Sequence, residues 1–232
     1  QAAQISNSAL MNSAGSYAEL SKNLADLNAG KIDLTSPWFK GVADIYVKLR
    51  TAGCFPDSPT GVTEASALNL FATGKSPILP TGTFSMGAVK ALNPALTGKM
   101  NLMSMVLTDG KVIAEGIMNN TFNLSVNAKS TSTNQKIALS FLSYLATGPV
   151  AAIYGNATTQ HVNVLDVNYT NVDLLNTSPF QGKNTMLAPR FLILNTAVSD
   201  LTQDALIQIV GGKNTDDVLA DFSKQIKQKL AG

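Results

Sequence analysis

The sequence predicts an α/β fold, because amphipathic helices alternate along the chain with short apolar segments that suit β-strands. At 232 residues the chain is long enough for one large domain or two small ones. Charged residues make up only 14% of the sequence, and the formal net charge is +2. This low and balanced charge argues against a nucleic-acid-binding protein, so we expect no nucleic-acid partner.

Three helices are predicted in the first third of the chain. Apolar side chains recur there at three- and four-residue steps, and each run ends at a glycine. The second run has the clearest start, with Ser36 as N-cap and Pro37 at the first helical position. The three predicted helices cover about 8–28, 36–53 and 63–74.

Short strands are predicted in the middle of the chain. Ile78 and Leu79 form a short apolar run that Pro80 ends. Two longer runs, 101–107 and 121–128, favour strands, and the Asp-Gly pair within 108–111 is typical of a hairpin turn.

Helices return in the second half. One is predicted from about Ile137 to Gly148, and Pro149 starts another short one. A polar, turn-rich passage follows over about 155–185. Two final helices are predicted over about 189–209 and 215–230, with Thr215 as the cap of the last.

The sequence offers no credible catalytic group. Ser85 lies between Gly82 and Gly87, but a nucleophile elbow needs glycine two residues on either side of the serine. The only histidine, His161, lies in an Asn- and Thr-rich stretch. We therefore expect Ser85 to be a helix N-cap, and we expect neither a metal nor a cofactor. The single cysteine, Cys54, is interpreted as a small buried hydrophobe.

Phe84 is the residue whose role the sequence leaves open. A strand that ends at Gly82 lets the backbone approach a ligand, and an aromatic ring at that rim can stack on a sugar. The alternative is that Phe84 packs beneath the following helix.

Three segments in order resemble the solute-binding proteins of bacterial ABC importers, in the large carbohydrate-binding family that includes maltose-binding protein. The first is "ALNLFATGKSPILPTGTFSMGAVK", whose residues 71–84 match the family's order and spacing, with Phe84 in place of the usual tryptophan. The second is "TFNLSVNAKSTSTNQKIALSFLSYLATGPVAAIY", and the third is the closing "GGKNTDDVLADFSKQIKQKL".

The resemblance implies a type II, periplasmic-binding-protein-like fold of two lobes, here without most of the N-terminal lobe. Projected onto this chain, residues 1–116 are the first part of the C-terminal lobe. Residues 117–168 then belong to the N-terminal lobe, and 169–232 return to the C-terminal lobe. The middle segment is expected to need a covering partner, either the missing N-terminal portion or a second copy.

The implied function is the capture of a sugar or oligosaccharide between two lobes and its delivery to the membrane permease subunits. The implied localisation is extracytoplasmic, as a periplasmic protein or a cell-surface lipoprotein. The candidate ligand contacts are Thr83, Phe84, Asn119, Asn120, Phe122, Asn7, Met11, Arg190 and Asn195. For the asparagines, a role in surface turns is the alternative.

Two other classes stay open at this stage. A non-catalytic surface or adhesion protein would also be rich in Asn and Thr, although β-sandwich spacing is more typical of that class. A serine hydrolase would need His161 beside Ser85.

Overall fold

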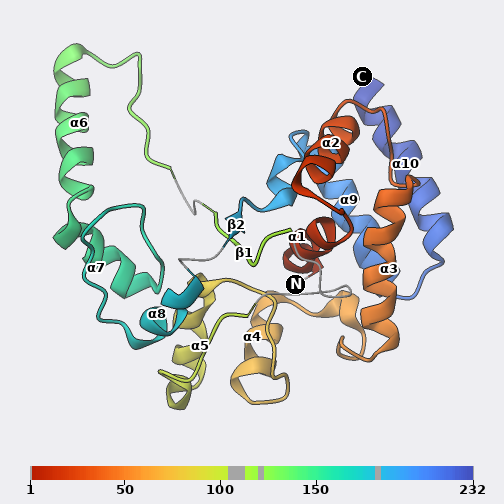
Figure 1. Cartoon of the computed structure of the whole chain (residues 1–232), viewed down its shortest axis with the longest axis horizontal. Helices are drawn as coiled ribbons and strands as arrows, with labels where there is room; N and C mark the ends of the chain where they lie inside the picture. Colours follow the sequence, from red (N-terminus) through yellow and green to blue (C-terminus); the bar gives the residue numbers. More distant parts are fainter. Residues whose placement is uncertain (1, 104–112, 120–122, 181–183, 232) are drawn as a thin grey trace. The chain divides into compact units, whose positions relative to one another are not determined.

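The computed structural model describes residues 2–103, 113–119, 123–180 and 184–231 (Figure 1). Helices dominate these residues, and they contain one parallel sheet of two short strands. The broad prediction of an α/β chain is confirmed, in an α-rich form.

The chain divides into two compact units, and each is built from separated segments. Unit 1 consists of Gln1–Ala67, Met103–Met118 and Asn184–Gly232. Unit 2 consists of Leu68–Leu102 and Asn119–Lys183. The assignment of 1–116, 117–168 and 169–232 to the lobes of the resembled family stays a prediction.

Unit 1 is a helical assembly around one apolar core. Its helices are α1 (Ala2–Asn12), α2 (Tyr17–Asn28), α3 (Pro37–Thr51), α9 (Thr196–Val210) and α10 (Thr215–Ala231). Helix α9 packs against α10 and α3, while α1 packs against α3 and α9. The largest side chains that this core buries completely include Phe39 and Tyr46 of α3 and Leu10 of α1.

The single helix predicted over 8–28 is wrong, because the chain breaks between α1 and α2. Ser16 caps α2, with its Oγ accepting a hydrogen bond from the backbone N of Glu19 (3.1 Å). Glu19 Oε2 in turn accepts from the backbone N of Gly15 (2.8 Å). This arrangement is a variant of the capping box, because Glu19 binds the N–H of the residue before the cap and not that of the cap itself. It starts a new helix inside an otherwise continuous apolar period.

The second predicted helix is confirmed as α3. Ser36 Oγ accepts from the backbone N of Phe39, Pro37 is in the first turn, and Gly53 follows the end with φ +72°. The third is confirmed as α4 (Glu64–Ala72), since Thr63 Oγ1 accepts from the backbone N of Ser66 (3.1 Å).

Helix α9 begins later than predicted, and α10 has a different cap from the one predicted. Residues 189–192 form a short 3₁₀ turn, η5 (Pro189–Leu192), and α9 starts only after Asn195. The cap of α10 is Asn214, whose Oδ1 accepts from the backbone N of Asp217 (3.1 Å), and not Thr215, which lies within the helix.

The sheet is not where the sequence predicted strands. Strand β1 (Gly116–Ile117) runs parallel to β2 (Thr185–Met186), with Gly116 opposite Thr185. Ile78 and Leu79 are not in a strand, and Ile78 is 52% exposed. The described part of the predicted strand 121–128, from Asn123 on, is not in a strand either. Residues 104–111, with the predicted hairpin turn, and 121–122 lie outside the described residues.

Unit 2 contains α5 (Met86–Leu92), α6 (Ser132–Leu145), α7 (Gly148–Thr158) and α8 (Val172–Thr177). The predicted helices on either side of Gly148-Pro149 are confirmed as α6 and α7, and Thr131 caps α6. Helix α8 falls in the passage over about 155–185 that was predicted to be polar and turn-rich. The buried core cluster of this unit is small and consists of Ala72, Met86, Val89 and Met100.

Cys54 is exposed, so the prediction of a buried cysteine is wrong. It follows Gly53 just beyond the end of α3, where the chain leaves the core.

Candidate functional site

The structure joins two of the predicted contact residues, Asn7 and Arg190, in unit 1. Asn7 lies on α1 and is only 3% exposed. Its Oδ1 accepts a hydrogen bond from the backbone N of Arg190 (3.1 Å), in the 3₁₀ turn η5. A buried amide is costly without a partner, and this one holds the turn against α1.

Asn28, the last residue of α2, holds the other end of the same turn. Its Nδ2 donates to the backbone O of Leu192 (2.7 Å), and its Oδ1 accepts from the backbone N of Leu194 (2.8 Å). Residues 190–194 are therefore fixed by two asparagine side chains from two helices. We call residues 190–194 the Arg190 turn.

The Arg190 turn presents an aromatic ring beside a cation. Phe191 is 58% exposed, and the guanidinium carbon of Arg190 lies 4.6 Å from the centre of its ring. At this distance the cation and the ring attract each other. Leu194, also in the turn, is 77% exposed. The turn therefore combines exposed apolar surface with guanidinium donors in a fixed backbone.

Burial shifts the pKa values of Arg190 and of its neighbour Tyr46. Desolvation lowers the pKa of Arg190, while its neighbour Tyr46 acts in the opposite direction. Burial raises the pKa of Tyr46, and the positive charge of Arg190 partly offsets that rise. Arginine stays protonated at neutral pH, so the turn keeps a positive group that can donate to oxygen acceptors.

Two other predicted contacts in unit 1 have structural roles. Met11 is 3% exposed and belongs to the core, and Asn195 caps α9 by accepting from the backbone N of Val198 (3.2 Å). Their contact with a ligand stays a prediction.

Thr83 and Phe84 lie together in the short turn η2 (Thr83–Ser85) at the start of α5, in unit 2. The Phe84 ring lies against the backbone of Gly82, because a Cβ built on that glycine would be 2.6 Å from the ring. Phe84 is still 45% exposed, so it offers an aromatic surface next to a residue that cannot carry a side chain without a shift. Ser85 occupies the N-cap position of α5 but makes no cap hydrogen bond there. Its Oγ pairs instead with Thr81 Oγ1 (2.7 Å).

The predicted contacts near residue 120 are described only in part. Asn119 is exposed, and Asn120 and Phe122 lie outside the described residues.

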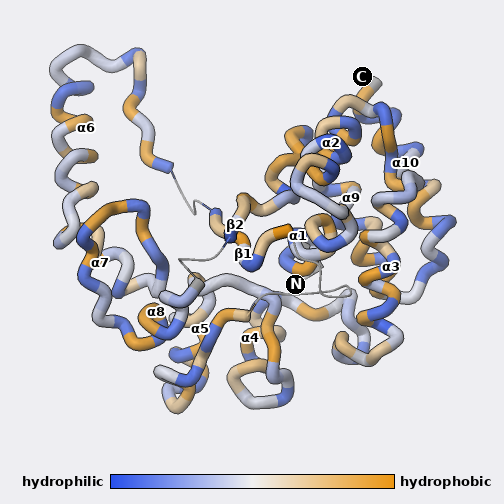
Figure 2. The backbone as a smooth tube through the Cα atoms, viewed as in Figure 1, coloured by the Kyte–Doolittle hydropathy of each residue, from blue (hydrophilic) through white to orange (hydrophobic). Residues whose placement is uncertain are grey.

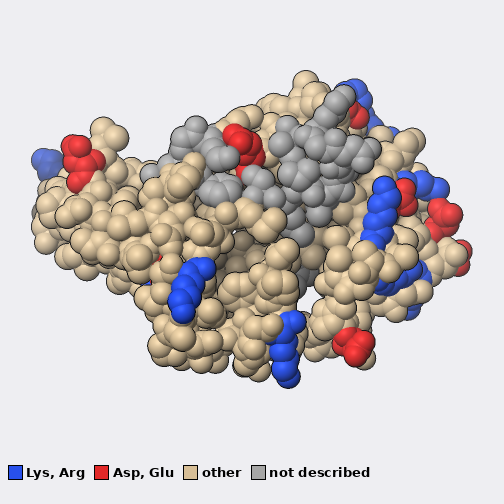
Figure 3. Space-filling model, turned by 60° about the horizontal axis from the view of Figure 1, so that its bottom comes forward, with Lys and Arg blue, Asp and Glu red and all other residues tan. Residues whose placement is uncertain are grey.

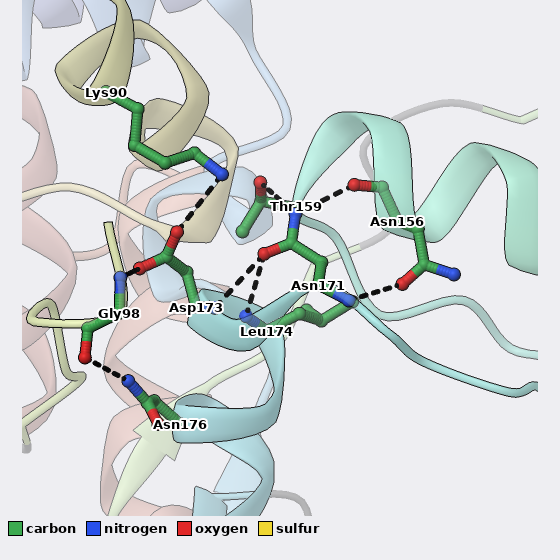
Figure 4. A network of polar contacts seen from close by, with 8 residues as sticks. All are labelled: Lys90, Gly98, Asn156, Thr159, Asn171, Asp173, Leu174 and Asn176. Carbon is green, nitrogen blue, oxygen red and sulfur yellow. Dashed lines mark hydrogen bonds and ion pairs between the residues drawn. The ribbon is translucent and has the colours of Figure 1, made fainter. Parts of the chain in front are cut away.

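A buried polar network that the sequence did not predict supports unit 2 (Figure 4). Asp173 on α8 is fully buried, forms an ion pair with Lys90 (3.1 Å) and accepts from the backbone N of Gly98 (2.8 Å). Asn176 Nδ2 donates to the backbone O of the same glycine (3.0 Å). Both backbone groups of Gly98, at φ +74°, are thus bound by side chains of α8.

Asn171 extends this network to α7. Its Oδ1 accepts from the backbone N of Asp173 and so caps α8, while its Nδ2 donates to the backbone O of Asn156 and to Thr159 Oγ1. Asn156 Oδ1 accepts from the backbone N of Thr170 and of Asn171. Because these bonds connect α7, α8 and the chain before α8, the network holds these segments of unit 2 together. The sequence signal for it was an asparagine cap followed by an acidic residue in the first turn.

His161 lies at the edge of unit 2's polar interior. Its Nε2 is 2.9 Å from Thr177 Oγ1, and its ring meets Tyr169 edge-on at 5.1 Å. Burial lowers the pKa of His161. These contacts pair His161 with Thr177, and Ser85 with Thr81, so they give the serine hydrolase alternative no support.

A shallow hollow of about 540 Å³ in unit 1 contains none of the predicted residues. It lies between the loop at Asp33–Thr35 and α10, and the ion pair of Asp33 with Lys227 (2.7 Å) lines it. Burial alone would raise the pKa of Asp33, but hydrogen bonds from Lys227 and Thr35 lower it to about 2. This carboxylate is therefore already engaged by the chain itself.

The described residues offer little sign of a metal site or of a strongly charged surface. They contain no group of three His, Cys, Asp or Glu side chains that could hold a metal ion. On the face shown in Figure 3, lysine, arginine and acidic side chains are scattered, and most of the surface is uncharged. In the described ranges no single helix is long and apolar enough to cross a bilayer. Helices α6 and α7 pass that test of length and composition only as a pair, with a 68° bend between them.

No protein-family model matches the chain, and no curated protein matches it.

Proposed function

We propose that the chain is the substrate-binding component of an ABC importer, which captures a sugar or oligosaccharide and delivers it to membrane permease subunits outside the cytoplasm. The proposal starts from three sequence segments in order that resemble the carbohydrate-binding family. It includes the type II two-lobed architecture of that family.

The Arg190 turn is the observation that carries the proposal. Sugar sites use aromatic faces for the apolar side of the ring and fixed polar groups for its hydroxyls. Phe191 and Arg190 offer both kinds of group, and Asn7 and Asn28 fix the backbone that carries them. Preorganised groups bind more tightly because less freedom is lost on binding. Phe84, exposed in unit 2, is a separate candidate for an aromatic contact on that unit.

A thermal-shift screen against neutral mono- and oligosaccharides tests this function. A specific sugar at 100 times its dissociation constant should raise the free energy of unfolding by about 2.7 kcal/mol. Failure of every sugar in the panel to stabilise the protein would favour the non-catalytic surface protein instead.

The sugar that stabilises the protein is then titrated calorimetrically against Phe191→Ala. We expect a loss of affinity of about fivefold, because one stacked aromatic ring contributes on the order of 1 kcal/mol. Tyr17→Ala is the matched control, since Tyr17 is also an aromatic residue of unit 1 and is 58% exposed as well. Equal affinities for the two variants would remove Phe191 from the site.

A further inference from the structure

Helix α6 exposes an apolar face that nothing in the described part of unit 2 covers. None of its 14 residues is buried. Ile137, Phe141 and Tyr144 are 64%, 57% and 60% exposed, and their spacing places them on one side of the helix. We call these three residues the α6 stripe. Figure 2 shows apolar residues recurring along this helix. An amphipathic helix normally buries such a stripe, because packing supplies most of its stability.

The segment before α6 is extended and also lacks a partner in a sheet. Residues 123–127 belong to no strand pair among the described residues, and Leu124 is 54% exposed. A turn fixes this segment to the helix, since Gln135 Nε2 donates to the backbone O of Ala128 and of Ser130 (both 3.0 Å). The extended segment and the α6 stripe are therefore two exposed features that a fixed turn joins.

We propose that this surface docks a second copy of the same chain, with α6 stripe against α6 stripe and the two segments 123–127 paired edge to edge. Four side chains carry its apolar part, and each is more than half exposed. Large side chains bury about 150–250 Å² each, so the four offer on the order of 450 Å² per copy. Two copies then bury close to the lower limit of a specific interface, about 1,000 Å² in total, and the dimer is weak.

The charges and the backbone both favour a second copy over other occupants. From 123 to 158 the chain carries two charged residues, Lys129 and Lys136, and no acidic residue. A partner that binds through charge complementarity would find few charges on this surface. Two copies repel each other little, because each carries only these two charges. Bilayer lipid can cover an apolar stripe but supplies no hydrogen-bonding groups for an extended backbone, whereas an identical strand does. This inference does not rest on the proposed function.

Sedimentation velocity and native mass spectrometry, from micromolar to near-millimolar protein, measure the association. We expect a monomer–dimer equilibrium in the wild type and at least about a tenfold weaker dimer in Phe141→Glu, because a charge then faces the partner's stripe. Leu139→Glu is the matched control: it is on the same helix, is 55% exposed and lies on the opposite side from the stripe. Its dimer should keep the wild-type affinity.

Hydrogen exchange on the wild type provides a readout that does not depend on a variant. Amides of 123–127 should be protected at high protein concentration and exchange rapidly at low concentration. A monomer across the whole concentration range overturns the proposal, as do equal effects of the two substitutions. Binding of the wild-type monomer to phosphatidylcholine vesicles through α6 also overturns it and assigns the surface to lipid.

Discussion

Asn7 is a buried side chain that accepts a hydrogen bond from the backbone N of Arg190. Replacing it with alanine leaves the backbone N of Arg190 without its acceptor, and an unsatisfied buried donor costs about 1–3 kcal/mol. We expect Asn7→Ala to lower the free energy of unfolding by that amount in urea. Asn69→Ala is the control, because Asn69 is also helical but exposed. Equal stability of the two variants would contradict a structural role for Asn7.

His161 gives the chain a single titration near neutral pH, since it is the only histidine. Burial lowers its pKa in the folded state, so the unfolded state binds the proton first as pH falls. The free energy of unfolding should be constant above the ordinary histidine pKa, about 6.5, and should fall below it until the folded pKa is reached. Urea unfolding followed by circular dichroism at successive pH values measures this.

The variant His161→Gln should remove that dependence between pH 7 and pH 5. Asp33 does not interfere, because its pKa of about 2 places its loss of stability well below this range. A variant that keeps the wild-type pH profile would assign the effect to other groups.

At the scale of single elements, the capping box at Ser16 and Glu19 separates α1 from α2. Ser16→Ala should lower the free energy of unfolding by about 1 kcal/mol, because it removes the acceptor of the helix N–H of Glu19. Glu19→Ala should lower it by less, because the N–H of Gly15 that it leaves unpaired lies before the helix and is exposed. The two hydrogen bonds support each other, so the double variant should lose less than the sum of the single losses. Strictly additive losses, measured in urea, would show that the two bonds act independently.

The sequence predicted helices well where both ends carried local signals. Helix α3 has a Ser-Pro start and a glycine after its end, and both are used as expected. The helix predicted over 8–28 was wrong because the apolar period continues past Ser16, which is the cap of α2. The predicted strand at Ile78 failed because a strand needs a partner, and apolar letters alone cannot show whether one is present.

The candidate site was predicted only in part for the same reason. Asn7 and Arg190 were named from the resemblance, but their hydrogen bond joins residues far apart in the chain. Phe191 and Asn28 were missed, although an aromatic residue directly after Pro-Arg was a visible signal. Asp173 lies in a polar passage of the sequence, which gave no sign that the fold buries it beside Lys90 and Gly98.

At the scale of the whole molecule, the two units differ in how much core they bury. Among the described residues, the core cluster of unit 1 has 27 buried hydrophobic residues and that of unit 2 has four. Apolar burial is the main favourable term in folding, so unit 2 should be the less stable unit. The buried ion pair of Asp173 and the asparagine network hold unit 2 by polar contacts, which add little net stability for each bond.

We therefore predict two unfolding transitions on heating, with unit 2 melting first. Trp38, the only tryptophan, lies in the core of unit 1, so its fluorescence should report only the later transition, whereas far-ultraviolet circular dichroism should show both. Asp173→Asn keeps an acceptor for Gly98 but breaks the ion pair with Lys90, which is itself partly exposed. We expect a cost of about 1–3 kcal/mol, confined to the early transition. Asn7→Ala should move only the late one. Coincident transitions by the two probes would mean that the units fold as one, since a single cooperative unit gives every probe the same midpoint.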